Sequence, residues 1–315
     1  MGFESLLGNE RLKENLTGSL RRGRISHFYL ISGPEGSGKH TLARLLAAAI
    51  LCKSVDAPCE TCPPCRKVMQ GNHPDFITVE DPEHKNVAVK IVRQYREDIF
   101  IRPNESDHKI YLFPQELGIE GQNALLKILE EPPPYGVFFL LTDNPQKLLP
   151  TVRSRCTELA MQALPEKTML AALAREFPDA TPEDLRAAAQ RSGGWLGQAK
   201  AMLESGGEIS PQTEGFLRSF AARNALELVQ TLVPMEKWKR DQLTDILADW
   251  ILILEQALAC RSGLPAASAA ARELSAARTS MELMEAIRNL NKALDYARSN
   301  VSPAAVCGWL SWALR

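Results

Sequence analysis

The chain has 315 residues, of which 45% are hydrophobic and 24% are charged, values that exclude disorder as its main state. Its 37 basic and 38 acidic residues leave a net charge of −1, so no overall charge attracts it to nucleic acid or to an anionic membrane. The longest apolar run, Leu45 to Cys52, is far shorter than the roughly 20 residues of a membrane span. The N-terminal residues do not have the pattern of a signal peptide. We therefore expect a cytoplasmic protein.

The first half of the chain alternates short apolar segments with helical ones. The expected strands are residues 28–32, 75–80, 109–113 and 136–142, and the expected helices are 41–51, 87–100 and 119–131. Residues 136–142 read GVFFLLT, a continuous apolar run that suits a strand buried on both faces. Strands that alternate with helices predict a parallel sheet covered by helices on both sides.

The second half of the chain is expected to be helical. Helix starts are visible at Pro165 and at residues 181–184, where a threonine cap precedes proline and two acids. Apolar residues then repeat with helical spacing within 243–258 and 284–297. We predict three parts, which are an α/β domain at 1–162, a small helical domain at 163–208 and a larger helical bundle at 209–315.

A glycine-rich segment lies between the first expected strand and a helix. It reads GPEGSGKHT over residues 33–41, which is the strand-to-helix position that a phosphate-binding P-loop requires. Backbone N–H groups, the helix N-terminus and a lysine would contact the phosphates. The alternative is a glycine-rich turn that holds no ligand. The candidate binding residues are Gly33, Gly36, Gly38, Lys39, His40 and Thr41.

The positions that would hold Mg²⁺ carry unsuitable residues. His40 stands where a P-loop needs a hydroxyl group, and histidine is a poor ligand for this hard cation. Leu112 and Phe113 end the expected strand 109–113, where acidic residues are needed to hold Mg²⁺ and to activate water. Glu116 is either a displaced acid or an ordinary loop carboxylate. We therefore predict that ATP and Mg²⁺ are not bound productively.

Four of the seven cysteines are clustered in one short segment that is rich in proline. They are Cys52, Cys59, Cys62 and Cys65. Four thiolates complete the tetrahedral coordination of Zn²⁺ and leave no open position for catalysis, so we predict a structural zinc module at 52–65. Free cysteines are one alternative. An iron–sulfur cluster is another, although nothing else in the sequence suggests redox chemistry.

The segment TVRSRC, residues 151–156, follows the expected strand 136–142 and a short helical stretch. An arginine at the edge of a domain can enter the nucleotide site of a neighbouring subunit and stabilise charge on the transferring phosphate. On spacing alone, a solvated basic residue at the entrance to a strand explains Arg155 better.

Several segments together resemble one known family. They are GPEGSGKHTLA, the cysteine cluster, NHPDF, GQNALLKILEEPP, FFLLTDNPQKLLPTVRSRC and SGGWLGQAKAML. In this order they resemble the delta prime family of bacterial DNA polymerase III clamp-loader subunits, which are AAA+ proteins, and the resemblance covers nearly the whole chain. It implies an α/β P-loop AAA+ domain with a parallel sheet, a small helical lid domain and an all-α C-terminal collar for oligomerisation.

The resemblance also implies a function. Such a subunit is a rigid stator that hydrolyses no ATP and has no activity of its own within the DNA polymerase III holoenzyme. It joins gamma/tau and delta subunits in a five-membered ring that loads the sliding clamp on primed DNA during replication. Ser154, Arg155 and Cys156 match the family's Ser-Arg-Cys motif, which implies that Arg155 is an arginine finger acting in trans on the ATP of a neighbour.

Three other functions are alternatives to that of a stator subunit. An ATP-hydrolysing gamma/tau-like motor of the same ring would need the missing magnesium ligands, and Gln198 stands where the resemblance places a nucleotide-sensing arginine in active members. A P-loop kinase or nucleotide transferase would leave the helical C-terminal part unexplained, and a purely structural zinc module would leave the P-loop unexplained. The sequence does not decide whether the degenerate loop still holds a nucleotide or a phosphate.

Overall fold

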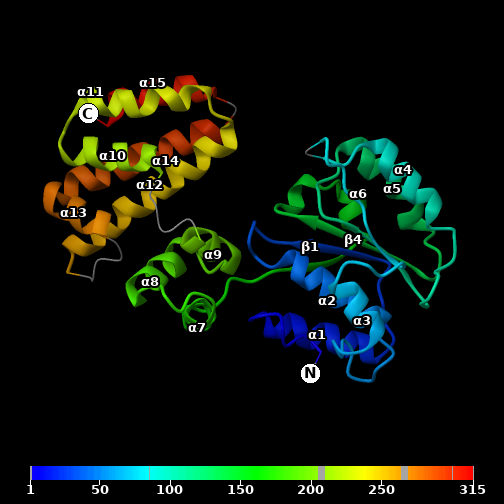
Figure 1. The fold of residues 1–315 in the computed structure, drawn as a ribbon. Helices are drawn as coiled ribbons and strands as arrows, with labels where there is room; N and C mark the ends of the chain where they lie inside the picture. Colours follow the sequence, from blue (N-terminus) through cyan, green and yellow to red (C-terminus); the bar gives the residue numbers. More distant parts are fainter. Residues whose placement is uncertain (1, 85, 205–209, 264–268, 300, 315) are drawn as a thin grey trace. The chain divides into compact units, whose positions relative to one another are not determined.

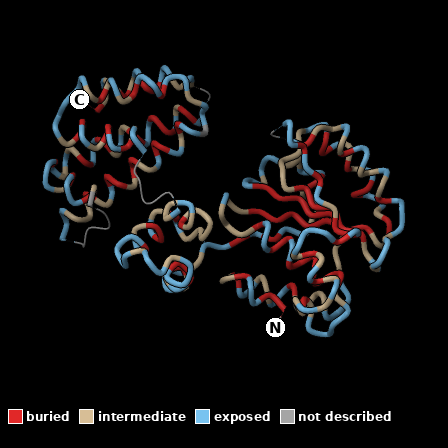
Figure 2. Tube along the Cα trace, viewed as in Figure 1, coloured by how far each residue is buried: buried red, intermediate tan, exposed pale blue. Residues whose placement is uncertain are grey.

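The structure, a computed structural model, describes residues 2–84, 86–204, 210–263, 269–299 and 301–314. The chain forms two compact units, one of residues 1–169 with 194–198 and the other of residues 170–193 with 199–315. Each unit has its own buried apolar residues, drawn in red in Figure 2.

The first unit is built around a parallel sheet of five strands, as the alternating pattern predicted (Figure 1). The strand order is β2-β3-β4-β1-β5, so β1 lies between two neighbours and all of its residues are buried. The strands are β1 (Phe28–Ser32), β2 (Phe76–Thr78), β3 (Lys109–Phe113), β4 (Gly136–Thr142) and β5 (Thr157–Ala160).

The two faces of this sheet belong to separate apolar cores. Tyr29 and Ile31 of β1 enter one core, whereas Phe28 and Leu30 enter the other, because successive side chains of a strand point to opposite faces. The first core also contains residues of α1 (Glu10–Arg21), α2 (Lys39–Leu51) and α3 (Pro63–Met69). The second contains residues of α4 (Val89–Asp98), α5 (Ile119–Glu130) and α6 (Pro150–Arg153).

The connections that follow β1 and β4 leave the sheet on opposite faces. The chain after β1 enters α2, while the chain after β4 passes through the short helix η1 (Pro145–Lys147) to α6. The two strands pair in parallel from Phe28↔Phe138 to Ser32↔Thr142, so their carboxyl ends lie side by side. Ligands of open α/β sheets bind where neighbouring strands send their connections to opposite faces of the sheet. The carboxyl ends of β1 and β4 are therefore the first place to look for a site.

Most predicted elements of the first unit are confirmed. The strands at 28–32, 109–113 and 136–142 have the predicted bounds, β2 is shorter than predicted, and the ends of α2, α4 and α5 differ from the prediction by no more than two residues. The prediction missed β5, α1 and α3. In β5 only Leu159 is buried, so this strand lacks the apolar run by which the others were found.

Within the described residues of the second unit, the regular elements are all helices. The predicted periodic segments lie in α12 and α14, and the indole of Trp250 in α12 stacks on Phe216 with ring centroids 4.1 Å apart. The helices are α7 (Glu166–Glu176), α8 (Pro182–Arg191), α9 (Leu196–Glu204), α10 (Pro211–Ala221), α11 (Ala225–Leu232), η2 (Val233–Lys237), α12 (Arg240–Arg261), α13 (Ala269–Ala277), α14 (Ser280–Arg298) and α15 (Pro303–Ala313), of which α7 and α9 begin on residues of the first unit.

The predicted division into three domains stays a prediction. Its second boundary, at 208, lies outside the described residues. Within the described part of the chain, no helix combines the length and the apolar character that crossing a membrane requires.

A buried carboxylate holds the loop that precedes β3. Asp75 accepts hydrogen bonds from the backbone N–H groups of Asn104 (2.6 Å), Glu105 (2.8 Å) and Ser106 (2.9 Å). Burial of Asp75 raises the pKa of its carboxyl, whereas these hydrogen bonds lower it. Together the hydrogen bonds outweigh the burial, so the pKa lies below its usual value. The carboxylate therefore remains ionised in the folded protein at neutral pH.

We expect the Asp75→Asn variant to lose about 1–3 kcal/mol of stability in the first unit at pH 7, because an amide replaces the buried carboxylate that accepts from three backbone N–H groups. A lowered pKa stabilises the fold above the unfolded-state pKa of about 3.9 and ceases to do so as the pH falls through the folded-state value. The difference from the wild type should therefore persist down to about pH 5 and shrink below about pH 4.

Amide hydrogen exchange of β2 and β3, together with urea unfolding across this pH range, measures the effect. Asp107→Asn is the matched control, since Asp107 is exposed in the same loop. An equal loss of stability in both variants would contradict the assigned role of Asp75.

Candidate functional site

The glycine-rich segment forms the connection between β1 and α2. Gly36 has a φ of 73° and Gly38, the residue before α2, has a φ of 91°, which are left-handed conformations that glycine adopts far more readily than other residues. Lys39 is the first residue of α2. This strand–loop–helix arrangement is the one that a P-loop requires, while phosphate binding by Gly33 to Thr41 stays a prediction.

The ammonium group of Lys39 is fully engaged within the chain. Its Nζ donates to the carbonyl oxygens of Gly33 and of Pro34 (3.0 Å), and it pairs with Asp143 Oδ1 at 2.6 Å. Asp143 directly follows β4. A lysine ammonium has three N–H donors, and each of these three contacts can use one of them.

The start of α9 covers the middle of the same loop. Gly197 N donates to Gly36 O, and Gln198 Nε2 donates to Glu35 O, both at 2.9 Å. A Cβ atom added to Gly36 would lie 2.6 Å from Gln198 N, and one added to Gly197 would lie 2.6 Å from Gly36 Cα. No side chain fits between these backbones, so both positions require glycine.

The residues at the predicted magnesium positions do not offer ligands for this ion. The side chains of His40 and Thr41 are exposed on the first turn of α2. Leu112 and Phe113 are buried and enter the two different cores of the sheet. The nearby acid, Glu116, binds Lys147 Nζ through both carboxylate oxygens, at 2.8 and 3.1 Å, so its charge is already neutralised by a lysine.

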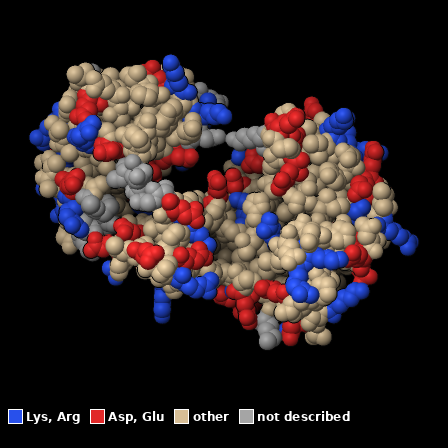
Figure 3. All heavy atoms as spheres, viewed as in Figure 1, with Lys and Arg blue, Asp and Glu red and all other residues tan. Residues whose placement is uncertain are grey.

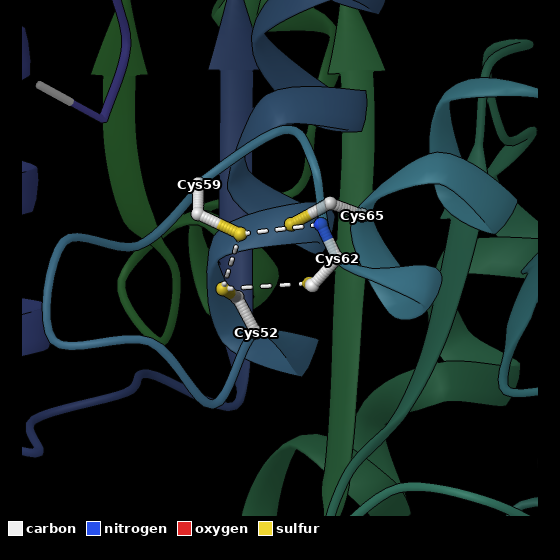
Figure 4. A group of neighbouring side chains, drawn as sticks. All are labelled: Cys52, Cys59, Cys62 and Cys65. Atoms are coloured by element: carbon white, nitrogen blue, oxygen red, sulfur yellow. Dashed lines mark hydrogen bonds between the residues drawn. The ribbon is translucent and has the colours of Figure 1, made fainter.

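The four clustered cysteines are brought together by two elements and the loop between them. Cys52 follows α2, Cys62 precedes α3 and Cys65 lies within α3, and Figure 4 shows the four sulfur atoms turned toward a common centre. The sulfur atoms of all four cysteines lie within 4.8 Å of one another. The Cys52 sulfur is 3.6 Å from that of Cys59 and 3.8 Å from that of Cys62.

This geometry can hold a metal ion. Four thiolates bound to one zinc ion at about 2.3 Å would have their sulfur atoms about 3.8 Å apart in a tetrahedron. The backbone N–H groups of Ser54 and Cys62 donate to the sulfur atoms of Cys52 and Cys59, each at 3.4 Å. The hydrogen bonds to Cys59, the largest from the Cys62 backbone, lower its pKa to about 6, which favours the thiolate form that binds metals.

The Ser-Arg-Cys segment lies between α6 and β5. The Arg155 side chain is 39% exposed, and its guanidinium contacts Thr151 O at 2.9 Å and Glu130 Oε1 at 3.2 Å. Ser154 is exposed and donates to Thr151 O. Burial raises the pKa of the Cys156 thiol to about 12, so this cysteine is an unreactive packing residue rather than a nucleophile.

The two arginines of this segment contact different parts of the first unit. Arg153 Nη1 donates to Gln146 Oε1, in η1, at 3.0 Å, whereas Arg155 reaches Glu130 at the end of α5. An exposed ion pair of this kind contributes little, about 0–1 kcal/mol. Arg155 can therefore exchange Glu130 for another anion at low cost.

Gln122 is a functional candidate that sequence reasoning passed over. It is buried at the start of α5, where its Nε2 donates to Leu117 O (2.8 Å) and Lys147 O (3.2 Å), and its Oε1 accepts from Leu149 N (2.7 Å). One amide thus fixes the segment that leads into α6 and the Ser-Arg-Cys motif. The only signal in the sequence was a glutamine on an otherwise apolar helix face.

Comparison with known proteins identifies the family. A family model described as DNA polymerase III, delta subunit, matches residues 8–165. The chain belongs to this family. It is also 36% identical over 177 residues to the DNA polymerase III subunit gamma/tau of Mycobacterium tuberculosis, which covers 55% of this chain and 31% of that protein.

One further sequence relative and one solved structure are also similar to this chain. The tau subunit of Escherichia coli is 32% identical over 245 residues, which are 73% of this chain and 38% of that protein. The chain thus spans about a third of the length of these two curated relatives. The clamp loader delta protein of Bacillus subtilis overlays with a TM-score of 0.36 and 13% identity, covering 96% of this chain and 99% of that one, a likeness too weak to support an argument.

We expect purified protein to contain one zinc ion per chain, held by the four clustered cysteines, and the Cys65→Ser variant to lose it because three thiolates bind the ion more weakly. Chelation should loosen residues 52–70, seen as faster amide exchange, and leave the helices of the second unit folded. Elemental analysis measures the metal content.

The matched control is Cys260→Ser, since Cys260 lies in α12 outside the cluster. Protein without zinc, whose four clustered thiols are all alkylated at the rate of free cysteine, would contradict this prediction.

Proposed function

We propose that this chain is a non-hydrolysing stator subunit of a DNA polymerase III clamp loader, of the delta prime type. In this role it helps to load the sliding clamp on primed DNA and supplies Arg155 in trans to the ATP site of a neighbouring subunit. Membership of the DNA polymerase III delta-subunit family supports the assignment to this machinery.

One observation carries the proposal that the subunit is inactive. Phosphoryl transfer in P-loop proteins needs Mg²⁺ held by a hydroxyl after the lysine and by acids at the end of a neighbouring strand. Here those positions are occupied by His40, Leu112 and Phe113, and the two apolar side chains are buried. An ion without these ligands would not be placed to activate water or to neutralise the developing charge.

The role of Arg155 is supported by its accessibility and its chemistry. Its guanidinium is always charged and offers a planar pair of N–H donors suited to a phosphate, and the side chain of Glu130, which it contacts, is itself 57% exposed. Aligned with the γ-phosphate of a neighbouring subunit, it would stabilise negative charge as the bond breaks. Hydrolysis would then depend on correct assembly of the ring, because a misplaced neighbour leaves the site incomplete.

The remaining parts of the proposal concern the partners. The helical second unit would serve as lid and collar, joining gamma/tau and delta subunits in a five-membered ring. Lysine and arginine alternate with aspartate and glutamate on the face drawn in Figure 3, so that face offers no broad basic surface. Contacts with the clamp and with DNA are assigned, as part of this proposal, to the complete complex.

A second candidate is an ATP-hydrolysing motor subunit of the gamma/tau type. The names of the curated relatives favour it, since those reported above are gamma/tau or tau subunits. The residues at the magnesium positions of this chain argue against it.

We expect the isolated chain to show no ATP turnover above background, because its P-loop lacks the magnesium ligands. Steady-state phosphate release with and without primed DNA is the measurement, and Lys39→Ala is the control. ATP turnover that disappears in the Lys39→Ala variant would favour the motor subunit instead.

We expect Arg155→Ala to leave folding, zinc content and assembly intact and to lower the DNA- and clamp-stimulated ATP turnover of the reconstituted loader. Loss of an arginine finger costs about 10³- to 10⁵-fold at the site it serves. The loss for the whole complex should be partial, because other subunit interfaces keep their own arginines.

The matched control is Arg153→Ala, which removes an arginine two residues away that contacts Gln146 and should have the smaller effect. Unchanged turnover and unchanged clamp loading with Arg155→Ala would reduce Arg155 to a solvated surface charge.

A further inference from the structure

The most unusual feature of the glycine-rich loop is the carboxylate beside its lysine. The side chain of Lys39 is only 9% exposed, whereas that of Asp143 is 60% exposed. The pair therefore consists of a buried cation and an anion that approaches it from the solvent side. A P-loop lysine ordinarily reaches the outer phosphates of a bound nucleotide, and Asp143 lies where its carboxylate can compete for that contact.

The topology explains why this carboxylate reaches the loop. Gly33 N donates to Thr142 O at 3.1 Å, so the first residue after β1 is bonded to the last residue of β4. Asp143 is the next residue, and it lies at the carboxyl ends of β1 and β4, where ligands of such sheets bind. The rigid, paired end of a central strand thus holds Asp143 within 2.6 Å of Lys39 Nζ.

The other contacts of the loop favour the same closed state. Glu35 O and Gly36 O accept hydrogen bonds from the start of α9, and the Ser37 hydroxyl is buried without a hydrogen-bond partner among the described residues. A buried hydroxyl without a partner costs stability, so the hydrogen bonds to α9 favour the closed loop while the Ser37 hydroxyl opposes it. The loop is therefore closed on itself and leaves one of its polar groups unsatisfied.

We propose that Asp143 is a built-in substitute for phosphate, whose carboxylate occupies Lys39 and prevents this loop from binding the phosphates of a nucleotide. An anion held directly after β4 competes at no cost in translational freedom, whereas a free phosphate pays that cost on binding. This inference rests on the proposed function in one respect, which is that both describe a P-loop at which ATP is not hydrolysed. It adds a reason why the loop would not bind phosphates, the ion pair of Lys39 with Asp143, whereas the missing magnesium ligands explain the lack of hydrolysis.

Removal of the carboxylate should therefore create an anion site. Asp143→Asn leaves the Lys39 charge facing only neutral acceptors, and a buried cation without a counter-ion favours an external anion. We expect this variant to bind inorganic pyrophosphate and magnesium-free ADP at least about tenfold more tightly than the wild type, by isothermal titration calorimetry. The gain should disappear in the Lys39→Ala/Asp143→Asn double variant.

Two controls separate the pair from a general change of charge. Asp107→Asn changes the net charge equally at an exposed position of the same unit and should leave pyrophosphate affinity unchanged. Asp143→Ser removes the charge with a shorter side chain and replaces Asp143→Asn in the titration if circular dichroism shows that variant to be unfolded.

A measurement on the wild type needs no variant. Lys39 should be acetylated much more slowly than the exposed Lys90 in a mass-spectrometric footprint. The inference is overturned if Lys39 reacts as fast as Lys90, if the wild type binds pyrophosphate as tightly as Asp143→Asn, or if Asp107→Asn gives the same gain. ATP turnover by the isolated wild type would instead overturn the proposed function, so the two failures are distinguishable.

Discussion

The parallel pairing of β1 with β4 is the constraint on which the site depends. It places the end of one strand, which continues into the glycine-rich loop, beside the end of another, which continues into Asp143 and then toward the Ser-Arg-Cys segment. The two connections leave on opposite faces of the sheet. Lys39, Asp143 and the closely packed backbone of the glycine-rich loop therefore lie together at the carboxyl ends of these two strands. The chemistry of this edge therefore follows from strand order as much as from the loop's own residues.

Helix α2 connects the loop with the cysteine cluster. It begins with Lys39 and ends immediately before Cys52, and most of its residues are buried in the core under the sheet. A helix packed in this way moves as a body, since buried side chains of a close-packed core permit little sliding. The cysteine cluster and the loop are thus held at the two ends of one rigid element.

Sequence patterns predicted the central strands because strands buried on both faces consist of continuous runs of apolar residues. The strand 136–142 is apolar throughout because both of its faces are covered, and its bounds were predicted without error. β5 was missed because it is an edge strand with one buried residue. The spacing of the cysteines predicted their convergence, whereas the ion pair of Lys39 with Asp143 joins residues 104 positions apart, and no local pattern announces a contact of that range.

The close contact between Gly36 and Gly197 has a consequence for how this chain can change. The glycines and the lysine that define a nucleotide-binding motif here also join β1, β4 and the start of α9. Replacing any of them would disturb packing even in a cell where the loop never meets a nucleotide. Selection for folding alone would then preserve the motif. Its presence in a descendant of this protein would therefore indicate that the fold needs these residues, and would not indicate that the descendant binds or hydrolyses a nucleotide.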